Sequence, residues 1–290
     1  MPRANSNGLD LEYETFGSSA NPPLVLVMGL GAQMINWDND FCGLLGDEGF
    51  LVIRFDNRDI GLSTYLDELP LPDMTALLGG DLSQAPYGLP DMADDLAGLL
   101  DALGIERAHV VGASMGGMIA QQFAINHPAR LLTLCSIMST TGDRTVGRAT
   151  PEALAALMRP AATSREEAIE QGALGSVIIG SPGFPVPEEE RRAKAAASYD
   201  RAVHPAGTAR QMAAVVASPD RTEGLRTVTA PTLVIHGEAD PLVDQSGGKA
   251  TAAAVPGSDL LTIPGMGHNL PRETWPAIVG GIVRNARRAA

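Results

Sequence analysis

The chain has 290 residues, of which 44% are hydrophobic and 19% charged, and its formal net charge is −13. This length and composition fit a soluble globular protein with one α/β core and an insertion. The acidic charge lacks a compensating basic cluster, which argues against nucleic acid as a partner. No apolar run approaches the roughly 20 residues of a membrane span, and the N-terminal MPRANSNGLDLEYE lacks a signal-peptide core. We therefore expect a cytoplasmic protein that does not bind membranes.

Short apolar runs bounded by turn residues recur along the chain and predict buried strands. They lie at 23–29, 50–56, 108–114, 131–139, 232–238 and 259–265. Their near-continuous apolar character is typical of parallel strands that are covered on both faces. Helical spacing of apolar residues follows at 90–103, 115–126 and 275–288. The alternation predicts an α/β fold with a doubly wound, mostly parallel sheet.

The pattern changes after the fourth of these runs, because alanine-rich helical segments replace the strands. Ser164 and Glu167 form an S-x-x-E capping box, which predicts a helix start there. The strand pattern resumes at Pro231, so we interpret residues 140–225 as a helical cap inserted into a core formed by 1–139 and 226–290. The non-periodic stretch 70–89 is interpreted either as a loop at the rim of a pocket or as a mobile segment.

A nucleophile elbow is predicted where the run 108–114 meets the helix 115–126. Gly112, Ser114 and Gly116 form the G-x-S-x-G pattern between a strand and a helix. Such a turn holds its serine in a strained conformation, and small neighbours let strand and helix approach closely. A turn with a purely structural role remains the alternative until a base and an acid are found.

Partners for the serine are expected in loops that follow later strands. A serine hydroxyl needs a base within hydrogen-bond reach, and the base needs a carboxylate to hold its tautomer. Asp240 ends TLVIHGEAD and His268 follows TIPGMG, which gives the chain order serine, aspartate, histidine. Asp244 and Glu238 are rivals for the acid. The other histidines are interpreted as structural or surface groups: His109, His127, His204 and His236.

Two backbone N–H groups are predicted to form an oxyanion hole. One belongs to Met115, directly after the nucleophile, and the other to Leu30 in the VMGLG segment. Gly29 and Gly31 allow an unusual backbone path around Leu30. A glycine turn without a catalytic task is the alternative interpretation.

The remaining candidates are apolar side chains and two cysteines. Residues that could line a substrate pocket, or simply pack in the core, are Met34, Met138, Leu174, Ile178 and Met212. Cys42 and Cys135 show no metal spacing and are predicted to be buried free thiols. The five histidines form no HxH or HExxH pair, so we expect no metal and no cofactor.

Together, the segments VMGLG, RFDNRDIGLS, GASMGG, HGEADPLV and IPGMGH resemble the α/β-hydrolase family over essentially the whole chain. Within the family, the sequence is similar to the bacterial aclacinomycin methylesterase-like branch, where methionine likewise replaces the histidine of the HG motif. The resemblance implies a Ser114–His268–Asp240 triad, an oxyanion hole at Leu30 and Met115, and a helical cap. One departure is Asp59, where many members have glycine. We interpret Asp56, Arg58 and Asp59 as a charge cluster that fixes their loop.

The predicted activity is hydrolysis of a small to medium hydrophobic carboxylic ester through an acyl-enzyme. A serine at position 114 argues against dehalogenases and epoxide hydrolases, which need an aspartate nucleophile. Alternatives are a carbon–carbon bond hydrolase acting on a vinylogous diketone, a lactonase, a perhydrolase, or a non-catalytic receptor for a small ligand. The expected partner is a small-molecule ester, and the expected state is a monomer or homodimer.

Overall fold

In the computed structural model, which describes residues 2–289, eight strands form one sheet in the order β1-β2-β4-β3-β5-β6-β7-β8. Strands β3 to β8 are parallel, whereas β2 pairs antiparallel with both β1 and β4. This confirms the predicted α/β class with a mostly parallel sheet. The strands are β1 Arg3–Ser6, β2 Leu9–Phe16, β3 Pro23–Val27, β4 Leu51–Phe55, β5 Ala108–Ala113, β6 Leu131–Ile137, β7 Thr232–Gly237 and β8 Asp259–Ile263.

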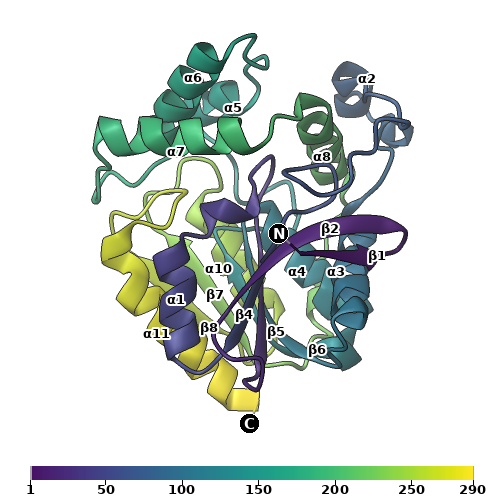
Figure 1. The fold of residues 1–290 in the computed structure, drawn as a ribbon, viewed down its shortest axis with the longest axis vertical. Helices are drawn as coiled ribbons and strands as arrows, with labels where there is room; N and C mark the ends of the chain where they lie inside the picture. Colours follow the sequence, from purple (N-terminus) through teal and green to yellow (C-terminus); the bar gives the residue numbers. More distant parts are fainter. Residues whose placement is uncertain (1, 290) are drawn as a thin grey trace.

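Helices cover both faces of this sheet (Figure 1). One face is packed by α1 (Asn39–Asp47) and α11 (Trp275–Ala286), whose apolar side chains share a core cluster with β3, β6 and β7. The other face is packed by α3 (Leu89–Ala102), α4 (Met115–Asn126) and α10 (Gln245–Ala254). Because both faces are covered, the central strands can be apolar throughout, as their sequences predict.

The chain between β6 and β7, which we call the cap segment (residues 140–225), contains no strand among its residues. The helices of the cap segment are α5 Pro151–Leu157, α6 Arg165–Ile178, α7 Glu188–Arg201, α8 Pro205–Ala217 and α9 Thr222–Leu225. Helices α5 to α8 gather at one end of the molecule, where α7 lies across that end and α8 lies beside α2 (Figure 1). Helix α9 instead packs against α4 and α10. The hydroxyl of Ser164 accepts a hydrogen bond from the amide of Glu167 at 3.2 Å, so α6 begins at the predicted cap.

Several elements were not predicted. The N-terminal hairpin turns at Asn7 and Gly8, which both have positive φ angles, as a tight Asn-Gly turn requires. Helices α1 and α10 were also not predicted, and the stretch 70–89 contains α2 (Met74–Leu78) as well as a 3-10 turn. The 3-10 turns are Met34–Asn36, Leu82–Gln84, Pro128–Arg130, Arg272–Thr274 and Arg287–Ala289.

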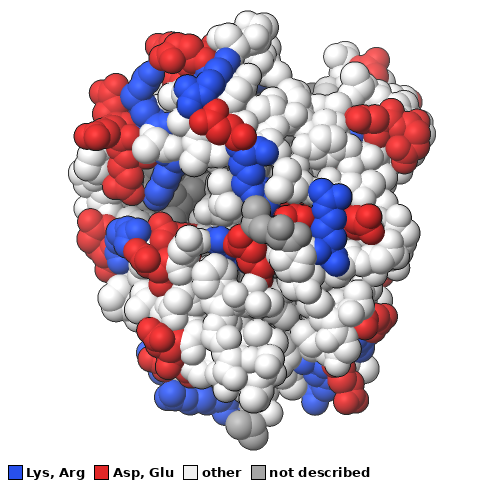
Figure 2. Space-filling model, viewed as in Figure 1, with Lys and Arg blue, Asp and Glu red and all other residues white. Residues whose placement is uncertain are grey.

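Surface charge is mixed rather than segregated on the face in Figure 2, where acidic and basic side chains alternate over the cap segment. Ion pairs join α6 to α7 there, namely Arg165 with Asp200 and Arg192 with Glu166, each at 2.7 Å. Within residues 2–289, none of the helices is long and apolar enough to cross a membrane.

Candidate active site

Ser114 occupies the sharp turn between β5 and α4, with φ of +57° and ψ of −123°. A non-glycine residue at positive φ is strained, and such strain is found where a side chain must be presented at a fixed point. The neighbouring glycines are needed for close approach. A Cβ atom on Gly112 would lie 2.0 Å from the Gly116 carbonyl oxygen, and one on Gly116 would lie 2.1 Å from that of Val27. The motif therefore has the geometry of a nucleophile elbow.

The structure brings Ser114, His268 and Asp240 together from three different loops. The Nε2 atom of His268, after β8, lies 2.9 Å from the Ser114 hydroxyl oxygen. Its Nδ1 atom lies 2.7 Å from Oδ2 of Asp240, after β7. The other oxygen of Asp240 accepts 2.9 Å hydrogen bonds from the amides of Leu242 and Val243. The two distances from the His268 ring nitrogens, to Ser114 and to Asp240, are those expected for a nucleophile, base and orienting acid.

Asp240 is held ionised although it is almost completely buried. Burial by itself would raise its pKa, but the neighbouring imidazoles of His236 and His268 lower the pKa to about 2. A carboxylate can only accept, so Nδ1 of His268 carries the proton and Nε2 is free to accept the serine proton. His236, interpreted above as structural or surface, is fully buried. Its Nε2 lies 2.7 Å from the Val243 carbonyl and 3.5 Å from Asp240.

Asp244 and Glu238, the alternative candidates for the orienting acid, have other hydrogen-bond partners. Asp244 caps the N-terminus of α10 and accepts from the Ser246 amide at 3.0 Å. Glu238 accepts from the hydroxyl of Thr262 at 3.0 Å. Among the residues described, neither carboxylate is hydrogen-bonded to His268.

The predicted oxyanion donors belong to the residue that follows the nucleophile and to a turn that contacts it. Residues 29–32 form a turn, which we call the oxyanion turn, closed by a 3.3 Å hydrogen bond between its first carbonyl and its last N–H. A Cβ on Gly29 would lie 3.0 Å from Cβ and 3.5 Å from Oγ of Ser114, so this turn contacts the nucleophile directly. Within residues 2–289, no intramolecular acceptor pairs with the N–H of Leu30 or Met115. Both groups are thus available to a bound oxygen.

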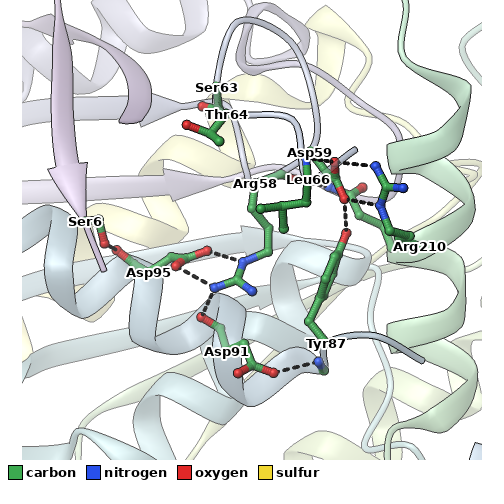
Figure 3. Close-up of polar contacts among 12 residues, drawn as sticks. Ser6, Arg58, Asp59, Ser63, Thr64, Leu66, Tyr87, Asp91, Asp95 and Arg210 are labelled. Carbon is green, nitrogen blue, oxygen red and sulfur yellow. Dashed lines mark hydrogen bonds and ion pairs between the residues drawn. The ribbon is translucent and has the colours of Figure 1, made fainter. Parts of the chain in front are cut away.

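The charge cluster of Asp56, Arg58 and Asp59 fixes its loop, but Arg58 and Asp59 pair with residues outside the cluster rather than with each other (Figure 3). Asp56 likewise pairs outside the cluster, with Arg201 of α7 at 2.7 Å. Arg58 forms a bidentate pair with Asp95 of α3, at 2.5 and 2.7 Å. Asp59, at φ of +70°, receives two hydrogen bonds from Arg210 of α8, at 2.7 and 2.9 Å, and one from the Tyr87 hydroxyl. The interpretation as a loop-fixing cluster is therefore too narrow, because the cluster also attaches the cap segment to the core.

Two more attachments, neither of them predicted from the sequence, reach the loops that carry the site. Gln211 of α8 accepts from the Gly31 amide of the oxyanion turn at 2.9 Å. On the other side, Ser181 accepts from the Gly267 amide at 2.8 Å, and the Ile179 carbonyl accepts from the His268 amide at 2.7 Å. The partners are far apart in sequence, so no local pattern could have indicated them.

The apolar candidates for substrate contact occupy varied environments. Met34 and Met138 are buried, Ile178 and Met212 are half-buried, and Leu174 on α6 is 47% exposed. Their role in substrate binding stays a prediction. Cys42 and Cys135 are buried free thiols, as predicted, and burial raises the pKa of both.

Comparison with known proteins places the chain in a family. Residues 22–272 match the model of the alpha/beta hydrolase fold family. The chain is 28% identical over 302 residues to rhodomycin D methylesterase of Streptomyces sp. (strain C5), covering 95% of this chain and 94% of that protein. The rhodomycin D methylesterase of Streptomyces peucetius gives the same identity and coverage.

Solved structures show the same fold. A hydrolase from Pseudomonas aeruginosa superposes with a TM-score of 0.72 at 27% identity, covering 97% of this chain and 96% of that one. An enol-lactonase from Burkholderia xenovorans gives a TM-score of 0.74 at 23% identity, covering 99% of this chain and all of its own.

Proposed function

This chain belongs to the alpha/beta hydrolase fold family, and we propose that it hydrolyses carboxylic esters with Ser114 as nucleophile, His268 as base and Asp240 as orienting acid. One observation carries the proposal. The two ring nitrogens of His268 lie 2.9 Å from the Ser114 hydroxyl and 2.7 Å from the Asp240 carboxylate, with the serine at an elbow beside two free amides. This is the arrangement that acyl transfer requires.

Acylation follows from the geometry. Nε2 of His268 removes the hydroxyl proton while Oγ of Ser114 attacks the acyl carbon, and Asp240 stabilises the imidazolium that forms. The negative charge that develops on the acyl oxygen is stabilised by the N–H groups of Leu30 and Met115. A single such donor lowers the barrier by about 3 kcal/mol. When the intermediate collapses, His268 donates its proton to the leaving alkoxide and the alcohol departs.

Deacylation repeats the same steps with water as the nucleophile. His268 removes a proton from water, which attacks the acyl carbon of the Ser114 ester, and the second tetrahedral intermediate uses the same two amides. Collapse returns the proton from His268 to Oγ, which frees the carboxylic acid and regenerates the enzyme.

We propose that the substrate is a methyl ester of a hydrophobic carboxylic acid. The proposal is supported by two relatives named rhodomycin D methylesterases, which align over almost their whole length. The cap segment, which contributes the apolar candidates Ile178 and Met212, would then determine which acids are accepted.

The experiment compares the wild type with Ser114→Ala on p-nitrophenyl acetate and butyrate, and on the methyl ester of a polycyclic aromatic acid. Wild type should turn over all three, and Ser114→Ala should lose at least 10³-fold in kcat. Ser258→Ala, which removes a hydroxyl bonded to the Ala252 carbonyl away from the site, is the matched control and should keep wild-type rates. Equal rates for wild type and Ser114→Ala would refute the nucleophile assignment.

A further inference from the structure

The oxyanion turn has few internal means of holding its shape. It contains two glycines around Leu30, and its single internal hydrogen bond is long, at 3.3 Å. Gly31 has φ of +64°, which suits the third position of a type II turn. In a Gly-Leu-Gly segment the peptide planes on either side of Leu30 rotate easily. The direction of the Leu30 N–H must therefore be set from outside the turn.

The external contact comes from the cap segment. Gln211 on α8 is fully buried, and its side-chain oxygen accepts a 2.9 Å hydrogen bond from the Gly31 amide. Its side-chain nitrogen donates to the Arg58 carbonyl, also at 2.9 Å. One amide thus joins two core loops, and both of its ends are satisfied. Thr208, one turn earlier on α8, leaves only 3.0 Å for a Cβ at Gly31, so the same helix also limits the turn sterically.

The position of Gln211 is itself fixed by the preceding residue. Arg210 and Asp59 form a bidentate pair in which the two side chains are 1% and 0% exposed. This pair anchors α8 beside the loop that carries Arg58 (Figure 3). A second contact holds the residue after the turn, because Gln33 donates to the carbonyls of Ser198 and Ala202 in the cap segment.

We propose that Gln211 is a positioning residue that holds the Leu30 N–H toward the acyl oxygen in the transition state. The inference rests on the proposed function, because it assigns a task to the oxyanion turn only if Ser114 acts as the nucleophile. With this role for Gln211, the cap segment both covers the site and helps to position one of its oxyanion donors. Loss of the contact leaves the triad intact and weakens only the stabilisation of the oxyanion.

The test is Gln211→Met, which removes both hydrogen bonds at nearly constant volume. Misplacing one oxyanion donor should lower kcat about 10- to 100-fold and leave KM within about twofold, because the donor acts mainly in the transition state. The affinity for a trifluoromethyl ketone that forms a tetrahedral adduct should fall by the same factor as kcat. Stoichiometric labelling with a fluorophosphonate confirms that Ser114 is still present and reactive.

The matched control is Gln121→Met on α4. Gln121 is also fully buried, and its amide joins Ser136 and Arg221 rather than a loop of the site. We expect its thermal transition to drop about as much as that of Gln211→Met, with kcat unchanged. If Gln211→Met does not fold, Gln211→Asn supplies the second test, because the shorter amide withdraws from Gly31.

The possible outcomes separate the two proposals. If Ser114→Ala is inactive but Gln211→Met and Gln211→Asn keep wild-type kcat and ketone affinity, the positioning role is refuted and the proposed function stands. A change confined to KM refutes it as well, since it would place Gln211 in ground-state binding. If Ser114→Ala retains full turnover, the proposed function itself fails.

Discussion

Breaking the ion pair between Asp59 and Arg210 should weaken the attachment of the cap segment to the core. Arg210→Met removes the guanidinium and leaves the Asp59 carboxylate buried, where Tyr87 and the Leu66 amide are the only hydrogen-bond donors left among residues 2–289. Burial by itself would raise the pKa of Asp59, but the hydrogen bonds from Arg210 and the Leu66 amide lower it below its usual value. The carboxylate is therefore ionised in the wild type, and Arg210→Met removes the strongest of the interactions that keep its pKa low.

The burial of the pair determines how much stability Arg210→Met should lose. The two side chains are 0% and 1% exposed, and removing one member of such a buried pair costs about 3–5 kcal/mol of unfolding free energy. For a chain of this size, a loss of that order lowers Tm by about 10 °C. The double variant Asp59→Asn/Arg210→Met should recover part of the loss, because it leaves no unpaired buried charge.

Thermal unfolding, monitored by circular dichroism at pH 7 and at pH 3, measures the stability lost in Arg210→Met. The pair stabilises the fold above the unfolded pKa of Asp59, 3.8, and this contribution disappears as pH falls through the lower folded value. The difference between wild type and Arg210→Met should therefore shrink at pH 3. Arg226→Met, which breaks an exposed pair with Glu223, is the control and should barely move the transition. A loss for Arg210→Met no larger than that control would refute the reasoning.

Three further predictions concern the site and the core. Asp240→Asn should lower kcat about 10³- to 10⁴-fold, because the histidine tautomer is no longer fixed. Since the pKa of Asp240 is about 2 when folded and 3.8 when unfolded, the stability it adds is lost between about pH 4 and pH 2, so this variant should show a shallower acid transition. Gly116→Ala places a Cβ 2.1 Å from a β3 carbonyl and should lower the free energy of unfolding by about 3 kcal/mol. Gly175→Ala, with open space on α6, should raise it by about 0.5–1 kcal/mol. Urea unfolding measures both changes, and equal effects of the two variants would contradict the packing argument. Cys42 and Cys135 should not react with Ellman's reagent until the protein is denatured, and a fast equivalent in the native state would contradict their burial.

The fold and the loops of the site could be predicted because their signals are local. A strand buried on both faces reads as an apolar run, and the ends of parallel strands meet at one edge of the sheet. Asp240 and His268 each follow such a run, so their approach to Ser114 followed from topology. The catalytic roles of these residues are still proposals, although the distances support them.

Elements with weak or contradictory local signals were missed. The edge hairpin at residues 3–16 is rich in polar residues, and its alternation is irregular. In α10, Gly247 and Gly248 oppose helix formation by propensity, yet a Cβ on Gly248 would lie 2.4 Å from the ring of His236. The helix is therefore maintained by close packing on β7, which a single-sequence pattern does not reveal.

The contacts of Gln211 and Ser181 could not be predicted for a different reason. Each joins residues that are distant in the chain: the residue numbers of Gln211 and Gly31 differ by 180, and those of Ser181 and Gly267 differ by 86. Glutamine and serine are ordinary residues on a helix or in a loop, and nothing in their neighbourhood marks them. Only the packing of the cap segment on the core gives them a partner.

The separation of β6 and β7 has a consequence for how the protein is made. These strands are neighbours in the sheet, but the whole cap segment is translated between Ile137 and Thr232. The nascent chain therefore carries an unpaired, strongly apolar β6 edge until β7 leaves the ribosome, and pairing over so long a loop is slow. We expect translation stalled inside the cap segment to yield an aggregation-prone intermediate, and chaperones that shield strand edges to raise the yield of folded protein.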